Sequence, residues 1–156
     1  MGGNLQIATL AGGCFWCTEA IFRRLRGVIE TEPGYVEGAE VIQIKFDPQI
    51  ISYEKLLEVF FALHDPTSLN KQGADGGTQY RSAVFYYDEN QKREAETAKA
   101  KIAGAVTEIV PLTNFSQAED FHKDFYEKNR NVGYCRIVID PKITKLYKQF
   151  GDIVTS

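Results

Sequence analysis

The hydrophobic pattern of the chain changes period at Gly12-Gly13, and this change constrains the fold more than any other feature. Before the two glycines, residues 5–11 alternate in the way typical of a strand with a buried face. After them the spacing is helical, and Gly27 is a residue at which a helix readily ends. One face of that expected helix carries Cys14, Cys17, Ile21 and Leu25. The pattern therefore predicts a strand, a tight turn and a helix that begins at Cys14.

Signals for strands and helices are mixed along the rest of the chain. Helices are expected after the capping residue Ser52, from Asp88 towards Gly104, from the capping box that starts at Ser116, and over residues 142–150. Further strands are expected over residues 28–36, 40–46, 81–87, 108–112 and 135–139. Residues 65–80 show no periodicity, and a loop of that length is more often functional than idle.

This order of elements mixes hairpins with crossovers. It favours an α+β fold, a two-layer sandwich with helices packed on a mixed β-sheet, over a doubly wound parallel sheet. The 156 residues contain no linker, repeat or low-complexity segment. We therefore expect residues 1–156 to form a single domain with one sizeable core.

Charge and hydropathy exclude several classes of protein. The formal net charge is -3 and no dense basic run is present, so nucleic-acid binding through a broad positive surface is not expected. No apolar run approaches the length of a membrane-spanning helix, and the segment MGGNLQ lacks the layout of a signal peptide. Three cysteines are too few for a disulfide scaffold. We expect reduced thiols, no membrane association and a cytoplasmic location.

Cys14 differs from the other two cysteines in its position. It follows two glycines at the start of a helix, where unpaired N–H groups and the positive end of the dipole stabilise a thiolate. A reactive role is therefore favoured over a structural one for Cys14. Cys17 lies on the hydrophobic helix face and Cys135 shares strand parity with Ile137, so core packing and function are equally plausible for both.

Three kinds of cysteine site compete as explanations of this motif. A zinc site needs four ligands, and one CxxC pair with His64 and His122 far apart does not supply the usual pattern. A cysteine protease needs a positioned base, and neither histidine comes with a partner motif. A dithiol-disulfide oxidoreductase is the serious rival, although a bulky Phe15-Trp16 pair between the cysteines better fits the wall of an apolar pocket.

Several longer motifs are specific enough to indicate a family. They include GGCFW at Gly12 to Trp16 followed by TEAIF, GY at Gly34-Tyr35, and AEVIQIKFDP at Ala39 to Pro48. The longest is HDPTSLNKQGADGGTQYRSAVFY from His64 to Tyr86, and AEDFHKDFY and the GYC of Gly133 to Cys135 follow. Together they closely resemble the A-type peptide methionine sulfoxide reductases over almost the whole chain.

The resemblance implies a fold, an activity and a set of site residues. The fold would be a ferredoxin-like plait, and the activity would be reduction of the S epimer of methionine sulfoxide, free or in proteins, to methionine. No metal or organic cofactor would be needed, and reducing equivalents would come from a thioredoxin. By resemblance the nucleophile is Cys14 and the acid is Glu40, the polar oxygen meets Asp75 and Tyr80, and the substrate methyl group meets Phe15 and Trp16.

The expected acid fits the strand pattern. A sulfoxide is a poor electrophile until its oxygen is protonated, so the site needs an acid that is neutral near pH 7. Glu40 has the parity of Ile42 and Ile44 and should point into an apolar face, where burial raises a carboxyl pKa. Composition alone fits a surface glutamate better, and it is the resemblance that favours the acid.

The chain departs from the family pattern at two places that affect oxygen binding. Many members carry a second substrate-facing tyrosine in a longer segment before the acid, so here Tyr80 acts alone or with Tyr35 in that place. Gly76 stands where a histidine often precedes the second glycine.

The recycling step has three candidate routes. Cys135 is slightly favoured as the resolving cysteine because a disulfide there leaves the first helical turn undistorted. Cys17 is the second candidate, and direct reduction of a Cys14 sulfenic acid by an external thiol is the third.

Two functions of other classes stay open at this point. A general dithiol oxidoreductase would use Cys14 and Cys17 on protein disulfides. A non-catalytic module would bind methionine-containing peptides through Phe15 and Trp16 without turnover.

Overall fold

The structure, a computed structural model, describes residues 4–155. Residues 1–3 and 156 lie outside the described part, and with them the beginning of the MGGNLQ segment considered above.

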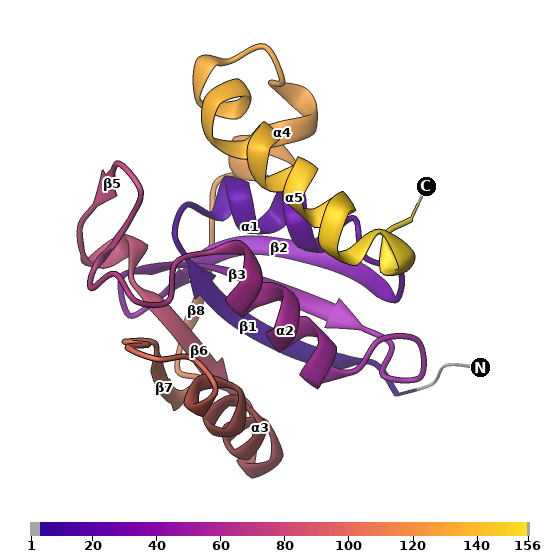
Figure 1. Cartoon of the computed structure of the whole chain (residues 1–156), viewed down its shortest axis with the longest axis vertical. Helices are drawn as coiled ribbons and strands as arrows, with labels where there is room; N and C mark the ends of the chain where they lie inside the picture. The colour runs from indigo at the N-terminus through magenta and orange to yellow at the C-terminus, as the bar shows by residue number, and fades with distance from the viewer. Residues whose placement is uncertain (1–3, 156) are drawn as a thin grey trace.

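Four central strands and two crossover helices make up the middle of the fold (Figure 1). Their order in the sheet is β6 (Ser82–Tyr86), β1 (Gln6–Gly12), β3 (Ala39–Phe46) and β2 (Val28–Val36), and each neighbouring pair is antiparallel. Each helix therefore links two parallel strands that have one antiparallel strand between them, which is the expected ferredoxin-like plait. Along the chain these elements are β1 (Gln6–Gly12), α1 (Phe15–Phe22), β2 (Val28–Val36), β3 (Ala39–Phe46), α2 (Tyr53–Leu63) and β6 (Ser82–Tyr86).

Two further strands extend the sheet at its edges. β7 (Glu108–Pro111) pairs in parallel with β6 after the crossover helix α3 (Glu89–Ala100), and β8 (Phe115–Gln117) pairs antiparallel with β2. The sheet is therefore mixed, as expected. The segment before β6 contains a two-stranded hairpin, β4 (Lys71–Gln72) with β5 (Asp75–Gly76), and the 3-10 turn η1 (Thr78–Tyr80).

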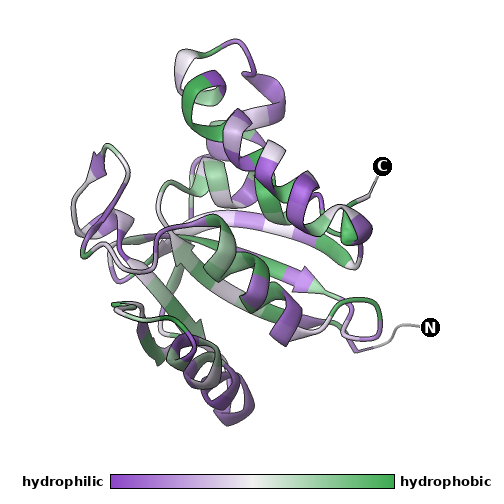
Figure 2. Ribbon diagram, in the orientation of Figure 1, coloured by the Kyte–Doolittle hydropathy of each residue, from purple (hydrophilic) through white to green (hydrophobic). Residues whose placement is uncertain are grey.

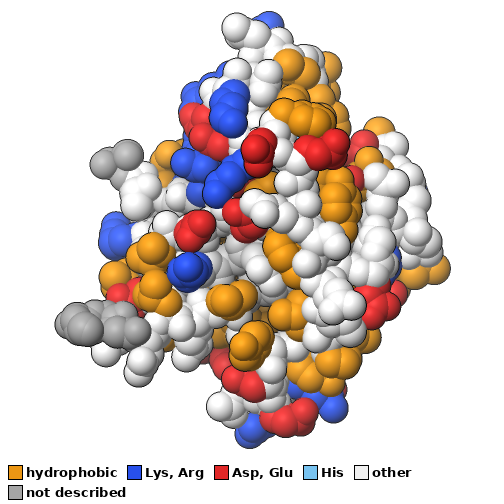
Figure 3. Space-filling view, turned by 180° about the vertical axis from the view of Figure 1, so that it is seen from behind, with side chains coloured by type: hydrophobic (Ala, Val, Ile, Leu, Met, Phe, Trp, Pro, Cys, Tyr) orange, Lys and Arg blue, Asp and Glu red, His pale blue; other side chains and the backbone are white. Residues whose placement is uncertain are grey.

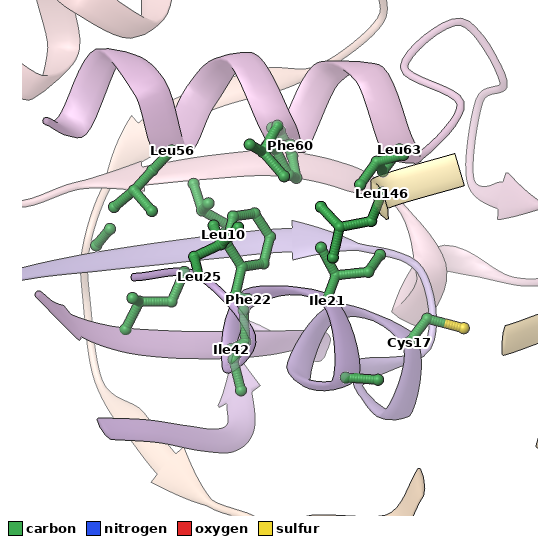
Figure 4. Close-up of a cluster of buried hydrophobic side chains, with 14 of the residues drawn as sticks. Leu10, Cys17, Ile21, Phe22, Leu25, Ile42, Leu56, Phe60, Leu63 and Leu146 are labelled. Atoms are coloured by element: carbon green, nitrogen blue, oxygen red, sulfur yellow. The ribbon is translucent and has the colours of Figure 1, made fainter. Parts of the chain in front are cut away.

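The main core lies between one face of the sheet and the helices. Figure 4 shows side chains of α2 facing those of β1, β3 and α1, with Cys17 at the edge of the cluster. The last helix, α5 (Asp140–Phe150), adds Leu146 to this core. α3 is strongly hydrophilic in Figure 2 and buries only Gln91 and Ala95. No helix of residues 4–155 is long and apolar enough to cross a membrane.

The other face of the sheet carries a smaller hydrophobic cluster that includes Val36, Val41 and Phe85. Phe115, the first residue of the edge strand β8 and the partner of Val36 in β2, packs against this cluster. Figure 3, which shows the molecule from behind, places hydrophobic side chains among charged ones on that side. All the long helices pack on the opposite face, so the two-layer arrangement expected from the sequence is confirmed.

The helix expected from the capping box at Ser116 is wrong. Ser116 instead pairs with Tyr35 in β8, and only the turn η2 (Asp120–His122) and the single-turn helix α4 (Phe125–Lys128) follow. The free edge of β2 offers main-chain hydrogen bonds to this segment, and the local capping preference does not outweigh them.

The strand expected over residues 135–139 is also wrong. Residues Cys135–Ile139 form a turn of π-helix, η3, that runs directly into α5. Cys135 and Ile139 are buried, whereas Ile137 between them is 76% exposed, so the period is helical rather than alternating. The buried stripe continues through Ile143, Leu146 and Phe150.

The close approach of β8 to β2 depends on Gly34. A Cβ at this position would overlap with the ring of Phe115 and the carbonyl oxygen of Ser116. We expect Gly34→Ala to lower the free energy of unfolding by about 2 kcal/mol, measured by urea titration. Gly151→Ala is the matched control, because Gly151 has a helical φ of -57° and no atom within 4 Å of an added Cβ. Equal effects of the two substitutions would contradict the steric explanation.

Candidate active site

Two glycines place Cys14 at the start of α1. Gly13 has a φ of 96°, and a Cβ there would lie 2.8 Å from the Gln72 side chain. A Cβ at Gly12 would press against Phe60 and His64. The turn from β1 to α1 can therefore pass close to the end of α2 and the loop that follows it. Cys14 becomes the N-cap of α1 with 9% of its surface exposed, at the helix start that the sequence predicted.

Glu40 points into the apolar side of the sheet, as its strand parity predicted. It is 8% exposed, and its two carboxyl oxygens have different partners. Oε1 accepts a hydrogen bond from the backbone N–H of Phe15 at 3.1 Å, and Oε2 accepts one from Gln79 Nε2 at 3.0 Å. Burial is the main cause that raises the pKa of Glu40, and these two hydrogen bonds only partly oppose it. A carboxyl group with a raised pKa thus lies beside the residue that follows Cys14.

Tyr35 and Tyr80 both lie within electrostatic reach of Glu40. Tyr35 is the partner of Glu40 in the pairing of β2 with β3, and Tyr80 ends η1. Burial raises the pKa of each phenol first, and the negative charge of an ionised Glu40 raises it further. Both phenols are therefore protonated donors at neutral pH. The structure brings three residues expected from the sequence, Glu40, Tyr80 and Tyr35, to one place.

Hydrogen bonding between the thiols of Cys14 and Cys17 shifts the pKa of both. That bond and burial raise the pKa of Cys14, as does the charge of Glu40, while the backbone N–H of Trp16 acts in the opposite direction. The bond with Cys14 is the largest cause that lowers the pKa of Cys17 to about 7. The expectation of a Cys14 thiolate stabilised by the backbone alone is therefore not supported for the free protein, because Cys17, burial and Glu40 all raise the pKa of Cys14.

Phe15 and Trp16 belong to an aromatic cluster with the C-terminal part of the chain. The ring of Phe15 lies 5.4 Å from that of Tyr35 and 5.0 Å from that of His122. Trp16 stacks on Phe125 at 3.7 Å, and its Nε1–H donates to His122 Nδ1 at 2.9 Å. The side chains that resemblance assigns to the substrate methyl group are thus held in fixed orientations.

Tyr134 connects Asp75 to the thiol pair. Its hydroxyl donates to Asp75 Oδ2 at 2.6 Å and lies 3.7 Å from Cys17 Sγ. Its ring also meets that of Trp16 edge-on at 5.7 Å. Asp75, expected beside the substrate oxygen, is therefore linked through Tyr134 to Cys17 in the free protein.

Cys135 is fully buried, and all three cysteines are free thiols. Burial is the first cause that raises the pKa of Cys135, and the charge of a Cys17 thiolate is the second. Of the two cysteines in the CxxC motif, Cys17 is therefore the one whose charge affects the pKa of Cys135.

The two histidines have packing contacts rather than partners of a metal site. His64 Nε2 lies 2.7 Å from Ser82 Oγ, and burial lowers the pKa of His64 to about 4, so the imidazole is neutral instead of complementing the helix dipole with a charge. Within residues 4–155 no group of three or more histidine, cysteine or acidic side chains is arranged to hold a metal ion.

Sequence reasoning did not assign functions to Gln79, His122, Phe125 or Tyr134. All four lie in motifs that carry the resemblance, but they contact the site only through folding: Trp16 and His122 are 106 positions apart. The available signal was the membership of these residues in the long motifs that carry the resemblance.

Comparison with known proteins identifies relatives along most of the chain. A sequence model of a family described as peptide methionine sulfoxide reductase matches residues 6–40 and 37–153. The peptide methionine sulfoxide reductase MsrA of Sulfolobus acidocaldarius is 48% identical over 170 aligned positions, which cover 95% of this chain and 97% of that protein.

Solved structures agree with this match. Reduced Mxr1 from Saccharomyces cerevisiae superimposes with a TM-score of 0.78 at 31% identity, covering 84% of this chain and 89% of that one. Mxr1 in complex with Trx2 gives a TM-score of 0.61 at 29% identity, covering 76% and 84%.

The raised pKa of Glu40 predicts a dependence of stability on pH. The folded state binds this proton more tightly than the unfolded chain, so the resulting stability is present below the unfolded pKa and is lost as pH rises through the folded pKa. Glu40→Gln has no such proton to lose. Urea unfolding measured upward from about pH 4, near the ordinary pKa of a glutamate, should show the variant gaining stability relative to wild type as pH rises. A difference that stays constant with pH would contradict this expectation.

Proposed function

Because the chain belongs to the peptide methionine sulfoxide reductase family, we propose that Cys14 is its nucleophile and Glu40 its acid. The reaction is thiol-dependent reduction of methionine S-sulfoxide, free or within proteins, to methionine, which repairs oxidised proteins. The observation that carries the assignment of roles is the hydrogen bond from the Phe15 N–H to Glu40, because it holds a buried acid next to the thiol. A general dithiol oxidoreductase would have no need of such an acid and is not favoured.

The acid and the thiol cooperate through the charge of Glu40. Protonated Glu40 donates to the sulfoxide oxygen and makes the sulfur electrophilic. In its neutral form it also stops opposing ionisation of Cys14, whose pKa its charge would otherwise raise further. Cys14 Sγ then attacks the sulfur. In sum, a sulfoxide and the Cys14 thiol become a sulfide and a Cys14 sulfenic acid, so the oxygen moves to Cys14 and the sulfide leaves.

The remaining residues orient the substrate. Tyr80 and Tyr35 are protonated donors within electrostatic reach of Glu40, and we assign them to the sulfoxide oxygen. Asp75 contributes through the hydroxyl of Tyr134, which adds a third tyrosine to the site. Phe15 and Trp16 provide the apolar wall for the methyl group, and its rigidity comes from His122 and Phe125. No cofactor takes part in this scheme.

We assign resolution of the sulfenic acid to Cys17. The backbone N–H of Cys17 donates to the Cys14 carbonyl at 3.0 Å, so the two residues share one helical turn, and hydrogen bonding to Cys14 lowers the pKa of the Cys17 thiol to about 7. The Cys17 thiol and the Cys14 sulfenic acid would give a disulfide and water. The slight preference for Cys135 from the sequence is not carried forward, because Cys135 is buried and its link to Cys14 runs through Cys17.

We assign the supply of electrons to a thioredoxin and the location to the cytoplasm. The yeast relative Mxr1 was solved in complex with Trx2, which supports a protein dithiol as the reductant here. Three free thiols fit a reducing compartment. Residues 1–156 would act as one domain, since the family match runs from residue 6 to residue 153.

The assay that tests this function uses the separate S and R epimers of a blocked methionine sulfoxide with dithiothreitol. We expect turnover of the S epimer only, and a loss of about 10³-fold or more in Cys14→Ser. If a folded wild-type protein reduces neither epimer but reduces insulin, it is a general dithiol oxidoreductase. If it binds methionine peptides without turnover and Cys14→Ser binds equally well, it is a binding module.

Resolution by Cys17 predicts the products of a single turnover. Reduced protein mixed with one equivalent of S-sulfoxide and no reductant should form a Cys14–Cys17 disulfide, identified by mass spectrometry of its peptides. Cys17→Ser should instead accumulate a Cys14 sulfenic acid that dimedone traps, while Cys135→Ser behaves like wild type. A disulfide that forms in Cys17→Ser and is lost only in Cys135→Ser would assign the step to Cys135.

A further inference from the structure

A groove of about 630 Å³ borders Cys14 and reaches the proposed site at Asp75 and Tyr134. The end of α2 and its loop, the β4–β5 hairpin and the C-terminal helical segment enclose it. Its lining includes neither Glu40 nor Tyr80, nor the aromatic pair Phe15 and Trp16. Its principal lining residues are Cys14, His64, Gln72, Tyr134, Ile137 and Lys142. The thiol of Cys14 can thus be approached from this groove without passing Glu40, Tyr80 or the aromatic pair.

Lys142 is the cation of this groove that has no partner of its own. Within residues 4–155 its ammonium group forms no hydrogen bond or ion pair. Lys145, one turn later on α5 and also in the lining, donates from Nζ to the backbone oxygen of Ala62 at 2.8 Å. The acidic groups beside the groove have other partners: Asp75 accepts from Tyr134, and Asp65 accepts from Thr67 and Ser68.

The charge of Lys142 acts on the thiol pair. After the larger effect of the bond with Cys14, Lys142 is the main charged group that lowers the pKa of Cys17. Cys17 itself is only 1% exposed and does not line the groove, whereas Cys14 does. In a Cys14–Cys17 disulfide, the sulfur that a reductant can reach from the groove is therefore that of Cys14, and the sulfur that leaves is that of Cys17.

We propose that this groove admits the thiolate of the reductant, and that Lys142 both attracts that negative charge and stabilises Cys17 as the leaving thiolate. The proposal rests on the function assigned above to Cys14 and Cys17. The reductant thiolate bonds to Cys14 Sγ, the Cys14–Cys17 bond breaks, and its electron pair goes to Cys17. A second thiolate then attacks the reductant's sulfur in the mixed disulfide, which releases Cys14 as a thiolate that takes up a proton, and the reductant leaves as a disulfide.

Small thiols of opposite charge test this directly. Protein oxidised to the Cys14–Cys17 disulfide by S-sulfoxide is reduced either with 2-mercaptoethanesulfonate, which is anionic, or with cysteamine, which is cationic. The measured quantity is the ratio of the two reduction rates at low ionic strength, because each thiol's own reactivity cancels between variants. We expect Lys142→Met to lower the ratio by about fivefold, as for the loss of one charge a few ångströms from the attacking thiolate.

Two further variants separate this effect from misfolding and from general surface charge. Lys142→Arg keeps the charge and should keep the wild-type ratio. Lys145→Met removes a charge from the same groove, but one that is bound to Ala62, and should change the ratio by less than about twofold. An unchanged ratio in Lys142→Met, or an equal fall in Lys145→Met, would overturn the proposal.

Failure of the proposed function would look different. If wild-type protein oxidised by S-sulfoxide contains no Cys14–Cys17 disulfide, the assignment of Cys17 is wrong, and the inference about Lys142 is wrong with it. If the disulfide forms and the charge ratio does not respond to Lys142→Met, only the inference about Lys142 is wrong.

Discussion

The hydrogen bond from the Phe15 N–H to Glu40 joins the two halves of the site, and most of its chemistry depends on it. The donor belongs to the first turn of α1 and the acceptor to β3, so the bond fixes the helix of the proposed nucleophile, Cys14, against the strand that carries the proposed acid. A helix start usually offers its free N–H groups to a negative charge. Here one of them is used by Glu40. The acid is placed by the same backbone group that would otherwise favour a Cys14 thiolate.

This arrangement favours a protonated Cys14 in the free protein. Burial, the bond with Cys17 and the nearby carboxyl all act in that direction, and a single helix turn does not outweigh them. A resting thiol is less exposed to unwanted oxidation than a thiolate, because oxidation follows thiolate character. Reactivity then depends on a substrate whose oxygen engages the acid, so activation of the thiol is coupled to occupation of the site.

Local sequence patterns were sufficient for the central fold and for the placement of Cys14 and Glu40, whereas the roles proposed for these two residues rest on the family resemblance. The change of period at Gly12-Gly13 placed Cys14 at a helix start, and strand parity placed Glu40 on a buried face. Patterns failed where a neighbour far along the chain decided the structure. Ser116 has the sequence of a helix cap but lies on the open edge of β2. Residues 135–139 alternate like a strand, yet in the structure only Cys135 and Ile139 of this segment are buried in the core.

The same limit applied to the site. His122, Phe125 and Tyr134 contact Trp16 from segments more than a hundred positions away, and no local periodicity reports such contacts. The protonation of the thiols could not be read from the CxxC spacing either, because it depends on burial and on Lys142 and Glu40 from other elements.

The packing of Trp16 has a practical consequence. It is the chain's only tryptophan, and its ring stacks on that of Phe125. Its indole N–H donates to the imidazole of His122, the last residue of η2. The tryptophan fluorescence of the protein therefore comes entirely from the edge of the proposed site. Filling of the pocket, oxidation of the neighbouring thiols and their reduction each alter the surroundings of this one indole. The protein thus contains an unlabelled optical probe that can follow every step of its cycle in real time.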